Sequence, residues 1–178
     1  MRRTVSLLAA AAFSAGAITL GVLPASAADA PAPPVSSIDI VIGPGLQKQA
    51  DDYGAREFGY LSEDLKKSVT GALNRSGRLA PDGGKLELVI SDAKPSRPTF
   101  AQLGRKAGLS MMSRSLGGAT ITGRLVTPNG DIPINYRWYE SDLRNQFATT
   151  TWSDAEQAFD MFAGRLARGE LPNRPATR

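Results

Sequence analysis

The sequence predicts a single α+β domain in which helices pack on one face of a mostly antiparallel sheet of about four or five strands. Two observations lead to this prediction. Residues 119–126 and 132–139 alternate apolar and polar side chains around a turn that contains Asn-Gly, a strong hairpin signal. Apolar residues at helical spacing over residues 61–73 and 155–166 indicate two helices. The expected element order is strand, helix, strand, short helix, strand, strand, helix.

The N-terminal residues 1–27 have the composition of a secretory signal peptide. A basic start is followed by an alanine-rich apolar run and by Ala25-Ser26-Ala27, which has the small-x-small pattern of a cleavage site. Residues 28–36 contain three prolines among alanines, and this composition favours an extended tether. We therefore expect the domain to span residues 37–171, with residues 172–178 as a tail.

Charge and composition limit the classes of function. Removal of the predicted signal peptide would leave 19 basic and 17 acidic residues, a balance that gives little support to a nucleic-acid partner. Without cysteine the chain forms no disulfide and has no lipidation site after the signal peptide. Without histidine it has neither histidine-dependent catalysis nor histidine zinc ligands. We expect a periplasmic or secreted protein with no cofactor, no metal and no membrane-spanning segment after signal cleavage.

The first half of the domain is predicted to be strand, helix and strand. Residues 37–42 alternate isoleucine with other residues and end at Gly-Pro-Gly, as a half-buried strand does. Residues 61–76 form a helix with Ser62 as a candidate cap and a glycine just past its end. Residues 85–91 form a second strand, and its inward side chains are Leu86, Leu88 and Ile90.

A long connection over residues 92–118 follows, and it exceeds most links inside compact domains. A capping-box pattern at residues 99–102 predicts a short helix in its middle. Residues 109–116 are interpreted as the start of the third strand or as a separate strand. Beyond the hairpin, residues 147–152 could add a last short strand, and residues 153–156 form a second capping box before the final helix.

The two faces of the hairpin are expected to differ. Tyr136 and Trp138 have the same strand parity as two isoleucines, so we interpret both aromatic residues as core. Arg124, Arg137 and Tyr139 belong to the opposite face, which is expected to meet solvent. The hairpin thus forms the floor on which the helices lie.

Arginines gather on this outer face and in the long connection. The predicted binding residues are Arg97, Arg114, Arg124, Arg137 and Tyr139. Guanidinium groups beside an aromatic ring can clamp a carboxylate or phosphate of a partner, because their donors form a planar fork. The alternative interpretation is that these arginines only keep a wet sheet face soluble and its edge unpaired.

Acidic residues suggest a different function. Those near loops or strand ends are Asp51, Asp52, Glu57, Asp92, Glu140 and Asp142. Two carboxyl groups flanking a glycosidic bond would make the protein a cell-wall glycan hydrolase. A solvated surface charge is the simpler interpretation of each, so we predict no catalytic residue and expect the protein not to be an enzyme.

The element order over residues 37–171 resembles small α+β domains of bacterial envelope accessory proteins. Examples are the N-terminal domain of the TolB translocation protein and the lipoprotein activators of penicillin-binding proteins. Residues 95–100, 113–119 and 136–140 are also similar to segments of exported proteobacterial proteins of unassigned role. The resemblance implies a periplasmic, non-catalytic binding or accessory protein that contacts an envelope protein or an anionic envelope polymer, and it transfers no functional residue.

A helix across an antiparallel sheet is also the architecture of cystatin-like peptidase inhibitors. The Gln-x-Val-x-Gly hairpin motif of that family is absent from this chain. Inhibition of a peptidase therefore remains a second alternative function, after glycan hydrolysis.

Overall fold

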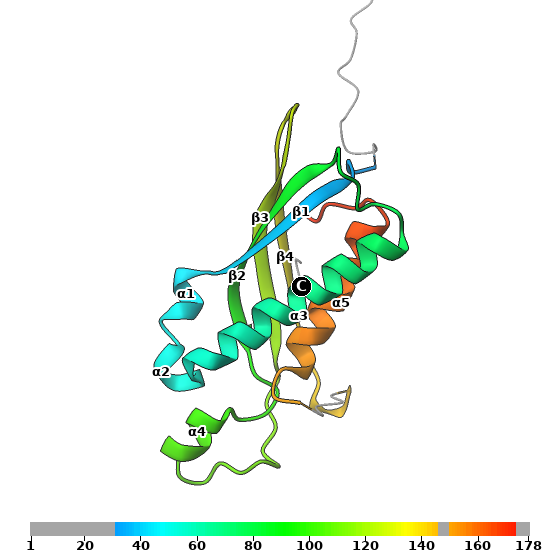
Figure 1. The fold of residues 1–178 in the computed structure, drawn as a ribbon. Helices are drawn as coiled ribbons and strands as arrows, with labels where there is room; N and C mark the ends of the chain where they lie inside the picture. The colour runs from blue at the N-terminus through cyan, green and yellow to red at the C-terminus, as the bar shows by residue number, and fades with distance from the viewer. Residues whose placement is uncertain (1–30, 146–149, 174–178) are drawn as a thin grey trace, which may run out of the picture. The chain divides into compact units, whose positions relative to one another are not determined.

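The computed structural model describes residues 31–145 and 150–173, and its elements follow the order expected from the sequence (Figure 1). Some predictions lie wholly or partly outside these residues: the signal peptide (1–27), the tether (28–36), the last short strand (147–152) and the tail (172–178). The rest of the predicted architecture can be compared with the structure directly.

Four strands form one sheet in the order β1–β2–β3–β4. Their bounds are β1 Val35–Ile42, β2 Gly84–Lys94, β3 Gly118–Thr127 and β4 Gly130–Tyr139. β1 pairs in parallel with β2, whereas the β2–β3 and β3–β4 pairs are antiparallel. A parallel pair needs a crossover connection, and the helical segment between β1 and β2 supplies it. The predicted fold class, a mostly antiparallel sheet with helices on it, is confirmed.

Two long helices cover one face of the sheet (Figure 1). α3 (Ala55–Arg75) packs on β1, α5 (Ser153–Ala167) packs on β3 and β4, and the two helices pack against each other. Their apolar stripes meet the inward side chains of the strands, and full burial of one such side chain stabilises the fold by about 1.5–3 kcal/mol. The largest fully buried side chains are Phe159, Phe162, Leu46, Leu61, Leu65, Leu73, Leu86, Leu88, Ile90, Ile121, Leu125 and Val69.

The predicted parity of the hairpin is correct. Ile121 and Leu125 of β3 are buried, whereas Arg137 of β4 is exposed. Tyr136 is buried and Trp138 packs against the core, as the shared parity with the isoleucines indicated.

The first helix begins earlier than predicted. Two short helices, α1 (Pro44–Gln47) and α2 (Ala50–Tyr53), precede it, and α3 already starts at Ala55. Ser62 therefore lies inside α3 and not at its cap. The helix continues through the exposed residue Gly59. A glycine in a helix costs about 1 kcal/mol, and the packing of the buried apolar residues of α3 outweighs this cost.

The expected strand over residues 109–116 does not form. β3 begins at Gly118, which pairs with Lys94, the last residue of β2. A strand over residues 109–116 would lie beyond Lys94, where β2 has already ended. Its backbone groups would therefore have no partner strand. The segment instead follows α4 (Phe100–Arg105), and its residues are largely exposed.

One of the two predicted capping boxes is present. Thr99 and Gln102 cap α4 reciprocally. Ser153 does not cap α5, because its hydroxyl contacts Thr150 and the cap position is Trp152. A serine distant in sequence supplies the missing acceptor, since the backbone N–H of Asp154 donates to Ser96 Oγ at 3.0 Å.

The same serine helps to close the base of the long connection. The buried residues Ser96 and Asp154 share the hydrogen bond above, and Gly117 N–H donates to Asp154 Oδ2 at 2.8 Å. Ser96 N–H donates to the carbonyl of Thr151 at 2.7 Å, and Ser115 Oγ donates to the carbonyl of Pro95 at 2.6 Å. Both ends of the connection are therefore fixed at the start of α5. The remaining short element is a 3-10 turn, η1 (Leu143–Asn145).

Candidate binding site on the open sheet face

The face of the sheet opposite the helices is polar and divides into two regions. We define the ion-pair region as Asp39, Lys85, Glu87, Arg124 and Asp131. We define the tyrosine region as Asp92, Lys94, Thr120, Arg137 and Tyr139. Both regions draw on β2, β3 and β4, so the same sheet presents two arrangements of charge.

In the ion-pair region each cation contacts two carboxylates. Lys85 Nζ lies 2.8 Å from Asp39 Oδ2 and 3.1 Å from Glu87 Oε1. The guanidinium of Arg124 lies 2.9 Å from Glu87 Oε2 and 3.1 Å from Asp131 Oδ2. Hydrogen bonds from Arg124 and then Lys85 lower the pKa of Glu87. The donors of Arg124 are thus already occupied by the protein's own carboxylates.

In the tyrosine region a hydrogen bond fixes the aromatic ring. Tyr139 is half-buried, and its hydroxyl donates to Asp92 Oδ2 at 2.6 Å and lies 3.2 Å from Thr120 Oγ1. Burial, followed by the bond to Asp92, raises the pKa of Tyr139 well above its usual range. The hydroxyl therefore keeps its proton, and continues to donate, in the alkaline range where an exposed tyrosine would ionise.

Two cations lie over this ring. Arg137 Cζ is 5.1 Å from the ring centroid of Tyr139, and Lys94 Nζ is 5.7 Å from it. Both distances fall within the range of a cation–π interaction. No carboxylate among the described residues forms an ion pair with Lys94 or Arg137. Their charges therefore remain available to a ligand.

An irregularity in β2 brings Lys94 to this face. Up to Ile90 the even-numbered residues of β2 point to the core, but the register shifts between Ile90 and Asp92. Such a bulge places two successive residues on one side, and here Ser91 contacts Thr122 Oγ1 at 2.7 Å while Asp92 accepts from Tyr139. Beyond the bulge the parity is reversed, so Lys94 faces outward.

A glycine lets the lysine reach the ring. Gly118 of β3 is paired with Lys94 on one side and with Tyr139 on the other. A Cβ atom at Gly118 would lie 2.5 Å from Tyr139 Cα and 2.8 Å from Tyr139 Cγ. The backbone φ of Gly118 is +147°, a conformation that also favours glycine. The absence of a side chain at this position leaves the space that the tyrosine ring fills.

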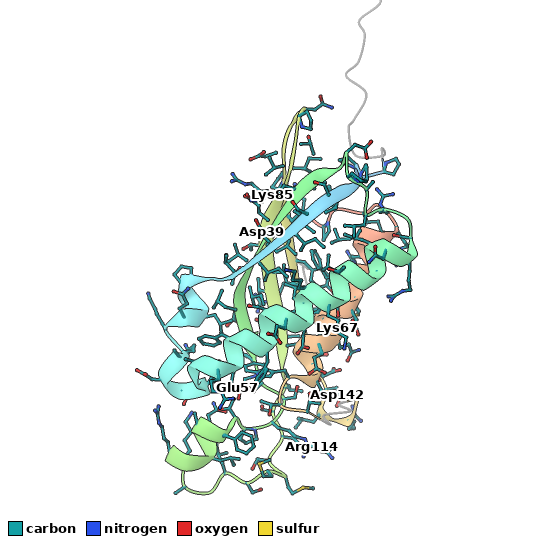
Figure 2. All side chains as sticks on the ribbon, in the orientation of Figure 1. Asp39, Glu57, Lys67, Lys85, Arg114 and Asp142 are labelled. Atoms are coloured by element: carbon teal, nitrogen blue, oxygen red, sulfur yellow. The ribbon has the colours of Figure 1, made fainter. Side chains whose placement is uncertain are left out.

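The structure brings together only part of the predicted binding set. Arg137 and Tyr139 are in contact. Arg124 belongs to the ion-pair region, four residues along β3 from Thr120 and therefore about 13 Å away. Arg97 and Arg114 lie on the long connection, where Arg97 donates to the carbonyl of Met111 at 2.9 Å. Figure 2 places Arg114 beyond the strand ends, at the opposite end of the sheet from the Asp39–Lys85 pair.

Sequence reasoning missed Lys94 and left Asp92 among the acidic residues considered for hydrolysis. A signal for both was present in the residues 90–93. Two polar residues in succession between Ile90 and Ala93 break the alternation of period two, and a broken alternation is what a bulge produces. The pairing of Arg124 with two carboxylates could not be predicted without the register of the strands.

Most carboxylates considered for hydrolysis have partners within the fold. Asp52 binds Lys106 at 2.7 Å and Gln102 at 2.8 Å, and Glu57 Oε2 accepts from Trp152 Nε1 at 2.8 Å. The other contacts are Asp92 with Tyr139, Glu140 with the backbone N–H groups of Ser141 and Asp142, and Asp142 with Arg144. These contacts give the carboxylates positions and local structural roles.

Comparisons with known proteins assign no family or function to the chain. No protein family model, curated protein or solved structure matches the chain. Across residues 31–145 and 150–173, no three histidine, cysteine, aspartate or glutamate side chains gather so that they could hold a metal ion. No helix in the described part of the chain is long and apolar enough to cross a membrane. The function is therefore inferred from the residues of the site.

Proposed function

We propose that this protein is an exported, periplasmic or secreted binding or accessory protein of the bacterial envelope. In this proposal the tyrosine region holds an anionic group of a partner, either a protein or an envelope polymer. The observation that carries it is the pair of cations, Lys94 and Arg137, lying over the fixed ring of Tyr139 without an ion-pair partner among the described residues. Export rests on the signal-like composition of residues 1–27.

The chemistry of the region suits a carboxylate or a phosphate. The guanidinium of Arg137 can stay stacked on Tyr139 while its edge forms two parallel hydrogen bonds to an oxyanion. Lys94 adds a second positive charge from β2, across Gly118 of β3. The single carboxylate of the region, Asp92, already accepts the hydroxyl of Tyr139, so an incoming anion meets an excess of positive charge.

The alternative function is carboxylate-dependent hydrolysis of cell-wall glycan. A glycosidase needs two carboxyl groups that flank the scissile bond, one of which gives up a proton. The hydrogen bonds that occupy Asp52, Glu57, Asp92, Glu140 and Asp142 favour binding over catalysis. Incubation of the protein with purified sacculi distinguishes the two: we expect bound protein and no release of soluble glycan, whereas release that Asp92→Asn abolishes would establish the hydrolase.

The binding proposal is tested with two double variants that each remove two positive charges from the same sheet face. Lys94→Ala/Arg137→Ala alters the tyrosine region, and Lys85→Ala/Arg124→Ala alters the ion-pair region. With poly-glutamate as the probe in calorimetry at low salt, we expect the first variant to bind about tenfold more weakly. The second variant, matched in charge, should change the affinity by less than about twofold. Equal losses in the two variants, or no binding by the wild type, would refute the proposed site.

A further inference from the structure

A second surface lies on the helix side of the protein, where α3, α4 and the start of α5 meet. Two hollows of about 440 and 300 Å³ share three lining residues, Glu57, Tyr60 and Phe100. The second hollow continues along the outside of α3 and α5. We define the aromatic–acidic groove as Glu57, Tyr60, Glu63, Asp64, Phe100 and Glu156.

The groove holds an aromatic ring in solvent. Phe100 is 79% exposed and Tyr60 is 49% exposed. Phe100 is the first residue of α4, which is capped by Thr99 and held to α2 because Gln102 Nε2 donates to Asp52 at 2.8 Å. Thr99 before Phe100 and Gln102 after it are both held by hydrogen bonds, so the backbone of Phe100 is fixed with its ring in solvent. Exposed apolar side chains beside a hollow are typical of interaction sites.

The groove also concentrates negative charge. Glu57, Glu63 and Asp64 come from α3, and Glu156 faces them from α5. Glu57 accepts from Trp152 Nε1 at 2.8 Å, and Glu156 accepts from Thr150 Oγ1 at 3.0 Å. No lysine or arginine of the described chain forms an ion pair with any of these four carboxylates.

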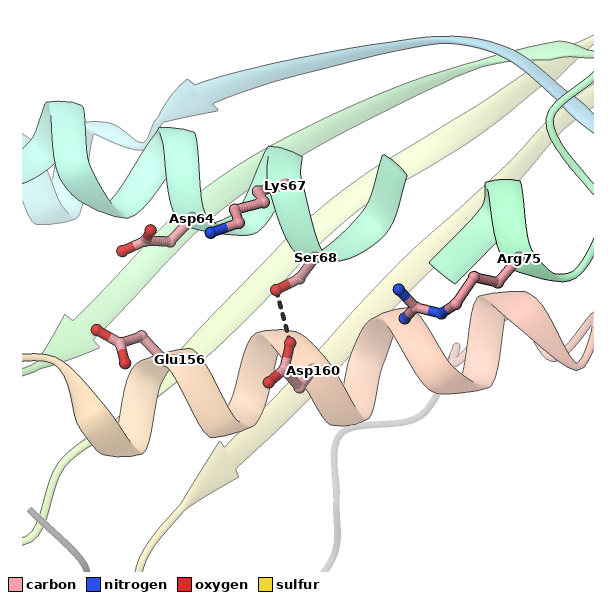
Figure 3. A pocket seen from close by; sticks show the side chains of 6 residues that line it. All are labelled: Asp64, Lys67, Ser68, Arg75, Glu156 and Asp160. Carbon is pink, nitrogen blue, oxygen red and sulfur yellow. Dashed lines mark hydrogen bonds between the residues drawn. The ribbon is translucent and has the colours of Figure 1, made fainter. Parts of the chain in front are cut away.

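Burial and mutual repulsion disfavour the charged forms of two carboxylates of the groove. Burial raises the pKa of Asp64 and of Glu156, and the repulsion between the two carboxylates raises that of Glu156 further. Lys67 offsets part of the effect on Asp64, and Arg56 lines the apolar hollow beside it. Figure 3 shows the adjoining hollow, of about 320 Å³, in which Asp64 and Glu156 face each other from two helices. A bound cation would relieve this repulsion.

We propose that the aromatic–acidic groove binds a cationic segment of a partner protein, with an arginine or lysine side chain on Tyr60 and Phe100 and its charge on the carboxylates of α3 and α5. Cations are attracted to aromatic faces, and carboxylates accept their N–H groups. The hollows have the volume of a few side chains, so an extended peptide fits them better than a folded surface. This site is separate from the tyrosine region in position and opposite in the charge it selects.

The probe is a fluorescent tetra-arginine peptide, titrated into the mature chain at low and at physiological salt. We expect saturable binding that weakens with salt, and a loss of about fivefold or more in the Tyr60→Ala/Phe100→Ala variant. Met112→Ala is the control for loss of an exposed apolar side chain outside the groove, because Met112 is 72% exposed on the long connection, and it should bind like the wild type.

A second pair of variants tests the charges. Glu63→Gln/Glu156→Gln should weaken binding of the peptide, whereas Glu170→Gln, which removes a carboxylate paired with Arg168, should not. Absence of binding at low salt, or equal binding by the aromatic double variant, would overturn the proposal. A shift to a dimer that the peptide disperses would show that a second copy occupies the groove instead. Lys94→Ala/Arg137→Ala should bind the peptide normally, so failure here is separable from failure of the tyrosine region.

Discussion

The ion-pair region and the tyrosine region present two cations each on the same face of the same sheet, but they use them differently. In the ion-pair region Lys85 and Arg124 are surrounded by three carboxylates. In the tyrosine region Lys94 and Arg137 share one aromatic ring, and the single carboxylate binds the tyrosine hydroxyl. The comparison shows that cations on one sheet face can differ in their partners: the protein's own carboxylates neutralise one pair, whereas the other pair lies over an aromatic ring.

The cause of the difference is the geometry of β2. Where its pleat is regular, Glu87 lies directly opposite Arg124 and the two side chains pair across the strands. After the shift between Ile90 and Asp92, the strand instead presents Asp92 and Lys94 to a glycine and an aromatic ring. One irregular position thus separates an internally neutralised surface from an available one.

The largest effect should come from filling the space at Gly118. In Gly118→Val the new side chain would collide with Tyr139, whose Cα lies 2.5 Å from the position of a Cβ atom, and the backbone φ is unfavourable. We expect the free energy of unfolding to fall by about 2–4 kcal/mol in urea denaturation. Gly59→Ala is the control, because nothing lies within 4 Å of its added Cβ atom in α3. That variant should be as stable as the wild type or more stable, and a Gly118 variant of equal stability would contradict the described packing.

The next effect concerns the hydrogen bond that fixes the ring. Tyr139→Phe keeps the aromatic face for Lys94 and Arg137 but removes the donor to Asp92. We expect a loss of about 1–2 kcal/mol in the free energy of unfolding, since a half-buried carboxylate loses its partner. The Arg124→Ala variant of the ion-pair region should lose less, because its contacts are exposed and exposed ion pairs contribute little. The reverse order in urea denaturation would remove the distinction between the two regions.

The two regions should also lose their contributions at opposite ends of the pH range. Because the pKa of Tyr139 is raised on folding, its contribution is fully present below the unfolded pKa of about 10 and is lost as the pH rises toward the folded pKa. The pKa values of Asp39 and Glu87 are lowered by Lys85 and Arg124, so their contribution is present above about pH 4 and is lost as the pH falls.

Urea denaturation at several pH values measures how the free energy of unfolding changes with pH at the acid and alkaline ends. Between about pH 9 and 11, Tyr139→Phe should lose less stability than the wild type. Tyr53 and Tyr136, whose pKa values are also raised by burial, remain in both proteins and serve as the internal reference. Identical alkaline slopes in the two proteins would show that the hydroxyl of Tyr139 does not retain its proton on folding.

The smallest effect is expected from salt. Moderate salt screens exposed charges, so the stability difference between Lys85→Ala and the wild type should vanish as sodium chloride is added. The Tyr139→Phe difference should persist, because a half-buried hydrogen bond to a carboxylate is screened much less. Salt titrations of thermal unfolding check both expectations, and a Tyr139→Phe difference that disappears with salt would contradict them.

Local patterns predicted the fold well. The alternation of Ile121, Leu125 and Ile134, and the stripe that includes Phe159 and Phe162, gave the correct faces because burial on one side forces that spacing. The capping box of α4 could also be predicted, because Thr99 and Gln102 are three residues apart in the sequence. Predictions failed where the partner is distant, as with Ser96, which supplies the acceptor at the start of α5.

The candidate site was predictable only in part for the same reason. Arg137 and Tyr139 are two residues apart on one strand, so their contact follows from strand parity alone. Arg124 lies on the same face of the sheet, yet its availability depends on Glu87 of another strand. Lys94 faces the site because a bulge in β2 reverses which residues point outward after it. Pairing across strands is a property of the register, which local patterns do not contain.

The fixation of both ends of the long connection has a consequence for engineering. Because Ser96, Asp154 and Gly117 bring the two ends together independently of what lies between them, the interior of the connection is a natural insertion point. Each doubling of such a closed segment costs only about 0.6 kcal/mol in closure entropy. Foreign sequences grafted between residues 107 and 113 should be displayed at one end of the sheet while the scaffold retains its fold.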